Sequence, residues 1–393
     1  MRTRNHHSVW RFILPALLSL LLLVLCYRYW NARYTYGKGD ELFAKMSAFL
    51  DLTGHSSAFP EEVLPVNISY DKDLVPFYDP NRIPMGDIAI THRGKLLAFL
   101  DSLATWDNYR YIVCDVMFSK GITTSADDSL YSRIASMRDI VVASSDNDPS
   151  VLSGKTAWSS YEIKHIGDDF LKYNYFSPKG EESIALRMHR DLDGSSIDRK
   201  SWWYSDKGQL CVNSLIPDME FIPDQIWRED DSKFIWNLGA DFLNSPFDMR
   251  PYTEGRIILI ADWLESDMHE TVKSELPGIV VIYNAYQALR QRDHIVRGWV
   301  LLLLALCFYA ELFVLLRPLW RDPKAEVAAH KLSSRWMRLL RAVGRALASW
   351  VGYTGFLAIV VGIIFLLTGF YVNVLVIGTI LSFLDAPIKR MAA

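Results

Sequence analysis

The stretch GRIILIADWLESDMHETVKSELPGIVVIYNAYQAL, from Gly255 to Leu289, places a polar segment between two apolar runs. The first run, Ile257 to Ile260, has the length and the β-branched composition of a buried strand, and Asp262 follows it. The second run, 278–282, predicts another strand, which leads into a helix from about Asn284. Two such strands and a following helix indicate a layered α/β domain.

Three residues of the polar segment stand two positions apart, namely Asp267, His269 and Thr271. Carboxylate, imidazole and hydroxyl groups bind metals and small ligands. Asp and Thr also accept backbone N–H bonds in loops, and His269 would then bond to one of them. The spacing leaves three interpretations open: an active site, a sensory pocket and a capped turn.

Strand and helix patterns also alternate upstream of this stretch. The predicted elements are strands at 87–90, 111–118 and 139–144, and helices at 91–106 and 125–137. Strands and helices that alternate over short connections imply right-handed crossovers and a parallel sheet. We therefore expect helices on the faces of a mostly parallel sheet.

The remaining outer segments are less periodic. Turn signals at Asp193-Gly194 and Lys207-Gly208 predict a β-hairpin insertion between 146 and 254. Residues 31–84 predict a helical stalk followed by a proline-broken loop.

Long apolar segments predict membrane anchoring. Phe12 to Val24 follows three arginines and lacks a small-residue cleavage site, so we expect a retained signal anchor. Trp299 to Leu316 predicts a second span. Trp350 to Leu384 exceeds the roughly 20 residues of one span and fits two tight ones. The fold class is therefore an α/β extracytoplasmic domain with one N-terminal and three C-terminal transmembrane helices.

Basic residues set the orientation of these spans. Arginines and lysines cluster before the first span, between the second and third, and after the last, so all three clusters should be cytoplasmic. The expected organisation is a cytoplasmic N-terminus (1–11), a transmembrane anchor (12–29), a periplasmic domain (30–297), a transmembrane helix (298–316), a basic cytoplasmic loop (317–349), two transmembrane helices (350–368 and 372–386) and a cytoplasmic tail (387–393).

The basic loop has the pattern of an amphipathic helix. Its apolar stripe comprises Leu332, Trp336, Leu339, Leu340, Val343 and Leu347. The neighbouring arc comprises Lys331, Arg335, Arg338, Arg341 and Arg345. Such a helix suits anionic lipid headgroups, so the bilayer is an expected partner. The net charge of −3 and the apolar stripe speak against a nucleic-acid partner.

Two further features involve single residues. Glu311 lies in the second span, where a carboxylate is costly and marks a functional position; it faces a helix bundle or a partner subunit, or it extends towards Arg317. The four cysteines have no metal-binding or redox spacing, and a Cys114–Cys211 bridge stays open.

Six residues are candidates for ligand binding at the carboxyl ends of the predicted strands: His92, Asp115, Asp262, Asp267, His269 and Thr271. Connecting loops converge there in open parallel sheets. An acidic, histidine-bearing rim suits a cationic solute, a divalent ion or a proton-sensitive ion pair, although no metal ligand set is assigned. The chain has no nucleophile elbow, zinc-protease motif, phosphate loop or dinucleotide fingerprint, so we expect neither enzymatic activity nor a cofactor.

The motifs YIVCDVMF…DDSL, DLDG…R…G…SL and RIILIADWLESDMHET…PGIVVIYNAYQAL occur here in one order. In this order and spacing the chain resembles the CHASE-type extracellular sensory domain, type two, of bacterial transmembrane receptors, from about Ile83 to Leu384. The resemblance implies a sensory input domain in the bacterial inner membrane, of a kind usually wired to a cytoplasmic cyclase, kinase or phosphodiesterase.

Two departures qualify this resemblance. Two extra residues separate Gly194 from Arg199, and Ala393 follows closely on the last span, so we expect no attached effector. The protein should detect an extracytoplasmic signal and pass it to a separate signalling or membrane protein, with a homo-oligomer as a further possible assembly. The alternatives are a structural subunit of a membrane complex and an extracytoplasmic hydrolase that uses Asp267 and His269.

The topology can be tested by cysteine labelling. A membrane-impermeant thiol reagent added from outside should label a Gly154→Cys variant and spare a Ser333→Cys variant, because the basic clusters place 154 outside and 333 inside. The unsubstituted chain controls for the native cysteines. The reverse labelling pattern would show that the topology is wrong.

Overall fold

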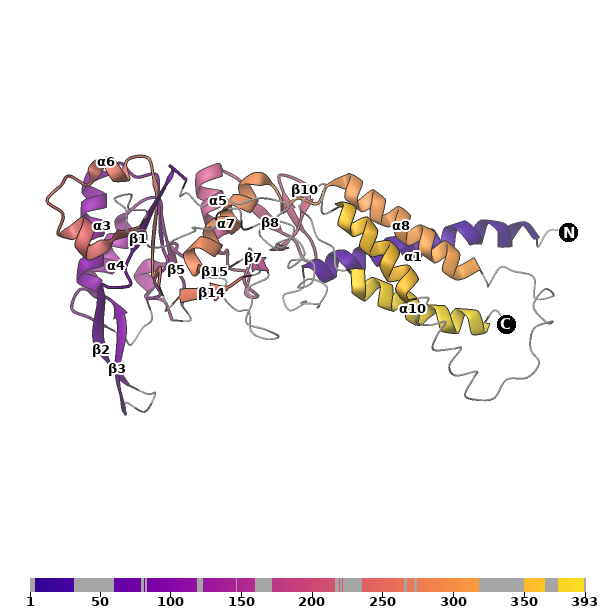
Figure 1. Ribbon diagram of the computed structural model, residues 1–393, viewed down its shortest axis with the longest axis horizontal. Helices are drawn as coiled ribbons and strands as arrows, with labels where there is room; N and C mark the ends of the chain where they lie inside the picture. The colour runs from indigo at the N-terminus through magenta and orange to yellow at the C-terminus, as the bar shows by residue number, and fades with distance from the viewer. Residues whose placement is uncertain are drawn as a thin grey trace. The chain divides into compact units, whose positions relative to one another are not determined.

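The computed structural model describes most of the chain (Figure 1). The described residues are 4–31, 60–78, 81, 83–118, 123–145, 147–159, 172–215, 219, 221, 235–264, 267–271, 274–317, 350–364 and 374–391. The chain forms two compact units. The α/β unit comprises Ser47–Ile197 and Leu215–Arg292, and the helical unit comprises Met1–Met46, Asp198–Ser214 and Asp293–Ala393.

A parallel sheet forms the centre of the α/β unit. Its strands, in spatial order, are β12 (Trp236–Asn237), β1 (Val63–Asn67), β13 (Ile257–Ala261), β4 (Tyr111–Cys114), β5 (Ile140–Ala143) and β6 (Thr156–Ala157). Every neighbouring pair in this order is parallel. This confirms the expectation of an α/β domain built on a parallel sheet.

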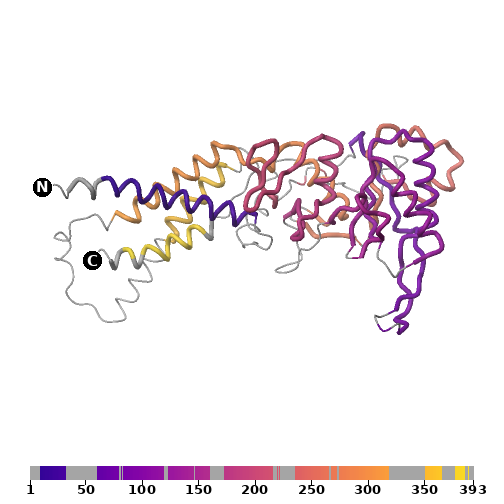
Figure 2. The backbone as a smooth tube through the Cα atoms, turned by 180° about the vertical axis from the view of Figure 1, so that it is seen from behind, coloured from indigo at the N-terminus to yellow at the C-terminus, as the bar shows by residue number. Residues whose placement is uncertain are grey.

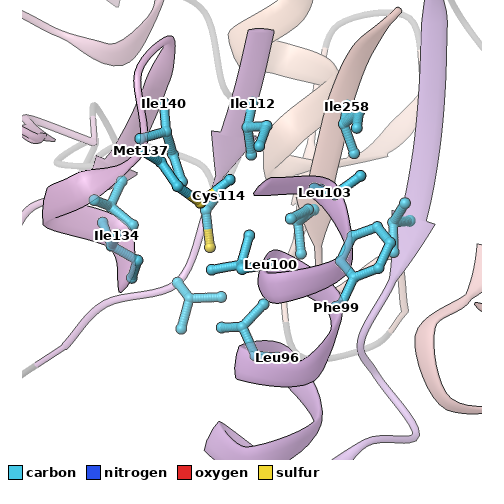
Figure 3. Packing of buried hydrophobic residues seen from close by; sticks show 14 of the residues in the cluster. Leu96, Phe99, Leu100, Leu103, Ile112, Cys114, Ile134, Met137, Ile140 and Ile258 are labelled. Atoms are coloured by element: carbon cyan, nitrogen blue, oxygen red, sulfur yellow. The ribbon is translucent and has the colours of Figure 1, made fainter. Parts of the chain in front are cut away.

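Helices cover both faces of this sheet (Figure 1). One face packs against α3 (Arg93–Trp106) and α4 (Asp127–Ser136), and the other against α5 (Ile184–Asp193) and α7 (Gly278–Gln291). The even-numbered strand residues Ile112, Cys114 and Ile258 join the core under α3 and α4 (Figure 3). Burial on both faces explains why the strands are almost wholly apolar.

The position of β13 separates the connections that leave neighbouring strands. β13 lies between β1 and β4 in the sheet, although more than a hundred residues separate it from both strands in sequence. The chain leaves β4 for α4 on one face, whereas it leaves β13 for α7 on the other. The connections therefore diverge at the carboxyl ends of these two adjacent strands.

Strand β1 corrects the prediction of a loop before residue 84. Pro65 interrupts its sequence, and proline in a central strand normally removes a ladder hydrogen bond. Ile68 N–H donates to Ala261 O of β13, so by alternation residue 65 faces β12. β12 pairs only with Val66 and Asn67, which leaves Pro65 outside the shared ladder.

The predicted strand at 278–282 is wrong, because these residues begin α7. Pro277 precedes the first helical residue, Gly278, and its fixed φ suits a helix start. Residues 278–286 are all buried, so the helix is apolar on every side. A short apolar run of that kind cannot be distinguished from a buried strand by periodicity.

The expected strand at 87–90 belongs to an antiparallel hairpin and not to the parallel sheet. β2 (Lys72–Tyr78) and β3 (Pro84–Thr91) form this hairpin, which projects from the rest of the α/β unit in both views (Figures 1 and 2). Its exposed apolar side chains include Leu74 at 73%, Met85 at 64% and Tyr78 at 52%.

The predicted β-hairpin insertion is present in shorter form. β9 (Tyr204–Asp206) and β10 (Gln209–Cys211) pair antiparallel across Lys207-Gly208, with β8 (Ile197–Arg199) beside β9. The other expected turn, Asp193-Gly194, is the C-terminus of α5. Gly194 there adopts a left-handed conformation with φ of 61°, which glycine tolerates without strain.

Smaller elements complete the α/β unit. They are η1 (Ser150–Leu152), β7 (Tyr173–Asn174), β11 (Ser214–Leu215), η2 (Leu238–Leu243), α6 (Arg250–Thr253), β14 (Met268–Glu270) and β15 (Glu275–Pro277). β14 and β15 form an antiparallel hairpin directly before α7, and this hairpin carries His269.

The helical unit contains α1 (Arg4–Trp30), α8 (Gly298–Leu316), an apolar helix at Trp350–Ile364, and α10 (Val374–Met391). α1 packs along α8, with Phe12 stacked on Phe313 at a centroid distance of 5.9 Å. Among the described residues, two helices are long and apolar enough to cross a membrane: Val9–Trp30 and Gly298–Leu316. The four-span count therefore stays a prediction.

Hydrogen bonds connect the small sheet of the helical unit to α1 and to the segment before α8. The Tyr27 hydroxyl donates to Cys211 O at 2.8 Å, and Val296 N–H donates to Leu210 O at 2.8 Å. Within this unit the buried His294 Nε2 lies 3.1 Å from the Asp206 carboxylate. All four cysteines of the chain are free, so the open Cys114–Cys211 bridge is not formed.

Glu62 connects the amino ends of strands β1 and β4 to helix α7. It precedes β1, and its carboxylate accepts hydrogen bonds from Arg110, which precedes β4, at 3.1 Å and from Arg290 of α7 at 2.6 Å. Tyr283 and Gln287 of α7 donate to the same group. Partial burial acts to raise the pKa of Glu62, but the charge and hydrogen bonds of Arg290, with the bonds from Tyr283 and Gln287, lower it on balance.

We expect Glu62→Gln to lower the free energy of unfolding by about 2 kcal/mol at pH 7, because charged hydrogen bonds to two arginines are lost. A carboxylate whose pKa is depressed on folding contributes stability above its unfolded pKa and loses it as pH falls through the folded value. The deficit should therefore narrow below about pH 4. Denaturant unfolding of the solubilised chain at both pH values measures this.

Glu61→Gln is the matched control, since the exposed Glu61 has no ion pair or hydrogen bond among the described residues. An equal loss in both variants, or a deficit independent of pH, would contradict this role for Glu62.

Candidate ligand-binding site at the carboxyl edge of the sheet

The carboxyl edge of the sheet, where β1, β13, β4 and β5 end, is where the structure brings polar side chains together. In open parallel sheets, ligands bind outside the strand ends at the point where neighbouring connections leave for opposite faces. β4 and β13 provide that arrangement here. Asp115 directly follows β4, and Asp262 directly follows β13.

Asp115 is the central residue of this edge. Its backbone N–H donates to Ile260 O of β13 at 2.8 Å. The alternation of β4 directs its side chain to the face covered by α5 and α7, and the carboxyl group has no hydrogen bond or ion pair with the described residues. Desolvation and the nearby charge of Asp267 together raise the pKa of Asp115 to about 8, against a smaller lowering by His269. Asp115 is therefore mostly protonated at neutral pH.

Asp267 and His269 form an ion pair beside Asp115. His269 Nε2 lies 3.3 Å from Asp267 Oδ1, with both side chains about one third exposed. The hydrogen bond to Asp267 raises the pKa of His269 in spite of desolvation, and the charges of Asp267 and Asp115 add to the increase. His269 thus contacts Asp267, one of the two partners that the sequence left open for it.

The N-terminus of α7 lies against the same carboxylate. A Cβ atom added at Gly278 would stand 2.7 Å from Asp267 Oδ2, so only glycine permits this approach. No side chain caps the first turn of α7. The positive end of the helix dipole favours a carboxylate at this position. Asp267 therefore connects the charge of the site to the first turn of α7.

The other buried or partly buried acids of this edge already have partners in the described part of the chain. Asp262 pairs with Lys72 at 2.9 Å and accepts from Ser69. The further pairs are Asp71–Lys95 at 2.7 Å, Asp73–His92 at 3.4 Å and Asp127–Arg93 at 3.9 Å. Asp115 is the exception, because no described residue forms a hydrogen bond or an ion pair with its carboxyl group.

The six predicted ligand-binding residues therefore fall into separate groups. Asp115, Asp267 and His269 lie together, whereas Asp262 belongs to the Ser69–Lys72 group. His92 caps α3 by accepting from Lys95 N–H. The Thr271 hydroxyl donates to Ser274 O at 2.6 Å within the turn between β14 and β15, which is the capped-turn interpretation for that residue.

Two residues of the site escaped the sequence analysis. Gly278 follows Pro277 at a helix start, and this signal was visible in the Pro-Gly pair. Tyr173 of β7 is close enough for the charge of Asp115 to help raise its pKa, although burial is the main cause. No local pattern marks Tyr173, because a two-residue strand brings it to the site.

The remaining candidate residues lie in the second predicted span and in the basic loop that follows it. Glu311 lies on the buried side of α8 at 6% exposure, and neither carboxylate oxygen has a hydrogen-bond partner among the described residues. It therefore faces the helix bundle and is not paired with Arg317. The predicted headgroup ligands Lys331, Arg335, Arg338, Arg341 and Arg345 lie outside the described residues.

No family model matches this chain, and no curated protein or solved structure matches it either. The resemblance to the CHASE-type sensory domain therefore stays a prediction that rests on the quoted motifs. The carboxyl edge itself supplies the physical basis for a function.

We expect Gly278→Ala to displace the Asp267 carboxylate and to lower the pKa of His269 towards its ordinary value, because the Asp267 hydrogen bond is the main cause of the increase. Alanine otherwise favours a helix over glycine. Overpacking should instead reduce the free energy of unfolding by about 1 kcal/mol. Histidine NMR titration and denaturant unfolding measure the two effects.

Gly298→Ala provides the control, since Gly298 also begins a helix but has nothing within 4 Å of an added Cβ. A His269 titration unchanged in Gly278→Ala would show that Asp267 does not depend on the space at residue 278.

Proposed function

We propose that this chain is a membrane protein whose α/β unit detects an extracytoplasmic signal at Asp115, Asp267 and His269. The signal passes to a separate membrane or membrane-associated protein. The observation that carries this proposal is the carboxyl group of Asp115 at the divergence of β4 and β13, which has no hydrogen bond or ion pair with the described residues. A perturbed acid in that position is a common feature of functional sites.

The chain path supports an output through the membrane helices. Asp267 lies against the first turn of α7, and residues 292–297 join the end of α7 to the start of α8. A change of charge at the site therefore acts on the helix that leads directly into the candidate span Gly298–Leu316. Glu311, buried in that span, is the proposed coupling residue.

Binding accounts for the site better than turnover does. A hydrolase that used His269 as a base would need a nucleophile within hydrogen-bond reach. Among the described residues, the only side chain paired with His269 is that of Asp267. The proposed function is therefore non-enzymatic.

A second candidate function is assembly of a membrane complex, and the β2–β3 hairpin favours it. Its large apolar side chains are exposed on a two-stranded ribbon, which is marginally stable alone. Exposed apolar patches of this kind commonly mark protein contacts. Leu74, at 73% exposure, is the most exposed large apolar residue of the hairpin.

Crosslinking in native membranes tests the output. We expect the wild-type chain to crosslink to a second protein, and Glu311→Leu or truncation before Trp299 to reduce that product about tenfold, because both remove the proposed coupling through the spans. Val314→Ala, a change on the exposed side of α8, is the control and should leave the product unchanged.

Two outcomes would redirect the proposal. If the wild-type chain crosslinks only to itself and the truncated chain retains full function, the spans are an anchor and the sensory function is wrong. If Leu74→Asp abolishes the crosslink while Glu311→Leu does not, the assembly function is the better account.

A further inference from the structure

The small sheet of the helical unit lies at the ends of both candidate spans. The Tyr27 hydroxyl, in the last turn of α1, accepts from Tyr204 N–H at 3.0 Å and donates to Cys211 O at 2.8 Å. Val296, two residues before α8, donates its N–H to Leu210 O at 2.8 Å, so β10 lies beside the start of α8 (Figure 1). These bonds fix the position of the sheet along the two helices.

The turn between β8 and β9 leaves a tryptophan exposed. Lys200 N–H donates to Trp203 O at 2.9 Å, which closes a turn with Ser201 and Trp202 at its centre. Trp202 is 48% exposed, and its ring packs against that of Trp203 with a centroid distance of 4.7 Å. The exposed side chains of Arg199, Lys200 and Ser201 have no ion pair or hydrogen bond with the described residues. The turn therefore presents an indole ring and two cations at its surface.

The chain between Tyr204 and Trp202 is short enough to keep the turn near the end of the span. Two extended residues cover at most about 7 Å. Tyr27 lies about 4.5 Å along the helix axis from Trp30, the last residue of α1. The headgroup layer on each side of a bilayer is about 5–8 Å thick. Trp202 is therefore within reach of that layer when Val9–Trp30 spans the hydrocarbon core.

We propose that the β8–β9 turn binds lipid, with the Trp202 indole in the headgroup layer at the C-terminal end of α1 and Arg199 and Lys200 on lipid phosphates. This inference rests on the proposed membrane location and adds a contact with the bilayer outside the spans. Tryptophan favours the headgroup layer, since its ring is apolar and its N–H is a hydrogen-bond donor. Basic side chains beside it are attracted to anionic headgroups.

The charge around the turn favours a lipid surface over a protein partner. Arg28, in the last turn of α1, is exposed and lies near Tyr204, as Arg199 does. The two arginines and Lys200 therefore form one basic patch at the end of the span, with Asp198 as an exposed acid beside it. A net positive patch next to an exposed indole is the composition of a membrane-surface element.

Depth-dependent quenching in the full chain in lipid nanodiscs tests this inference. A thiol-reactive fluorophore on Ser201→Cys reports the turn, because the four native cysteines are buried. In nanodiscs of phosphatidylcholine and phosphatidylglycerol, we expect a nitroxide on the lipid headgroup to reduce the emission about twofold and an aqueous quencher to have a smaller effect. Ser150→Cys, at an exposed serine of the α/β unit, is the matched labelling control and should respond to the aqueous quencher alone.

Substitutions in the turn separate the contributions of the ring and the cations. Trp202→Ala should restore most of the emission, whereas Trp202→Tyr, which keeps an amphipathic aromatic ring, should retain the quenching by the headgroup nitroxide. The double change Arg199→Gln with Lys200→Gln should remove the difference between nanodiscs with and without phosphatidylglycerol. Agreement of these variants with the expectations supports lipid as the ligand.

Three results would overturn the inference: aqueous quenching at residue 201 as strong as at residue 150, protection of the label at 201 from both quenchers, and headgroup quenching that survives in Trp202→Ala. The second result would identify a protein as the occupant of the turn instead. A chain that fails to insert into nanodiscs would contradict the proposed membrane protein as well, so the two failures are distinguishable.

Discussion

The insertion of β13 between β1 and β4 is the constraint on which the α/β unit depends. β13 continues into α7 on one face of the sheet, whereas β4 continues into α4 on the other. The connections after these two adjacent strands therefore run to opposite faces. The same insertion brings the polar connection after β13 beside the end of β4. Asp115 and the Asp267–His269 pair, which are about 150 residues apart in sequence, are for that reason close enough for their charges to act on one another.

The two edges of the sheet differ in the role of their acidic residues: at one edge an acid contributes to stability, and at the other the acids form the candidate ligand-binding site. At the amino edge, Glu62 is saturated by donors from Arg110 and α7, so its charge is fully compensated and its role is to fasten the helix to the strands. At the carboxyl edge, Asp115 has no such donors among the described residues, and desolvation is the main cause that raises its pKa to about 8. α7 contacts both edges, with Arg290 near one and Gly278 near the other.

The sequence anticipated the parallel sheet, α3, α4 and the strands at β4, β5 and β13, because their apolar runs are bounded by turns and caps. It also placed Asp115, Asp267 and His269 at one edge, since residues that follow parallel strands share an edge. It did not predict β1, because Pro65 interrupts the apolar run of that strand, and it predicted a strand where α7 begins. Both errors arise because packing against neighbouring elements, and not local preference, decides whether a short apolar segment forms a strand or a helix.

By itself, the sequence determined the class of fold, the apolar helices and the residue types available for chemistry, because hydrophobic periodicity and charge clusters are local properties. Only the tertiary structure decided which acids are neutralised. Asp262 acquires Lys72 of β2, and Asp71 acquires Lys95 of α3. Asp115 acquires none among the described residues. Whether a carboxylate finds a partner depends on how strands and helices pack in space, which no spacing along the chain encodes.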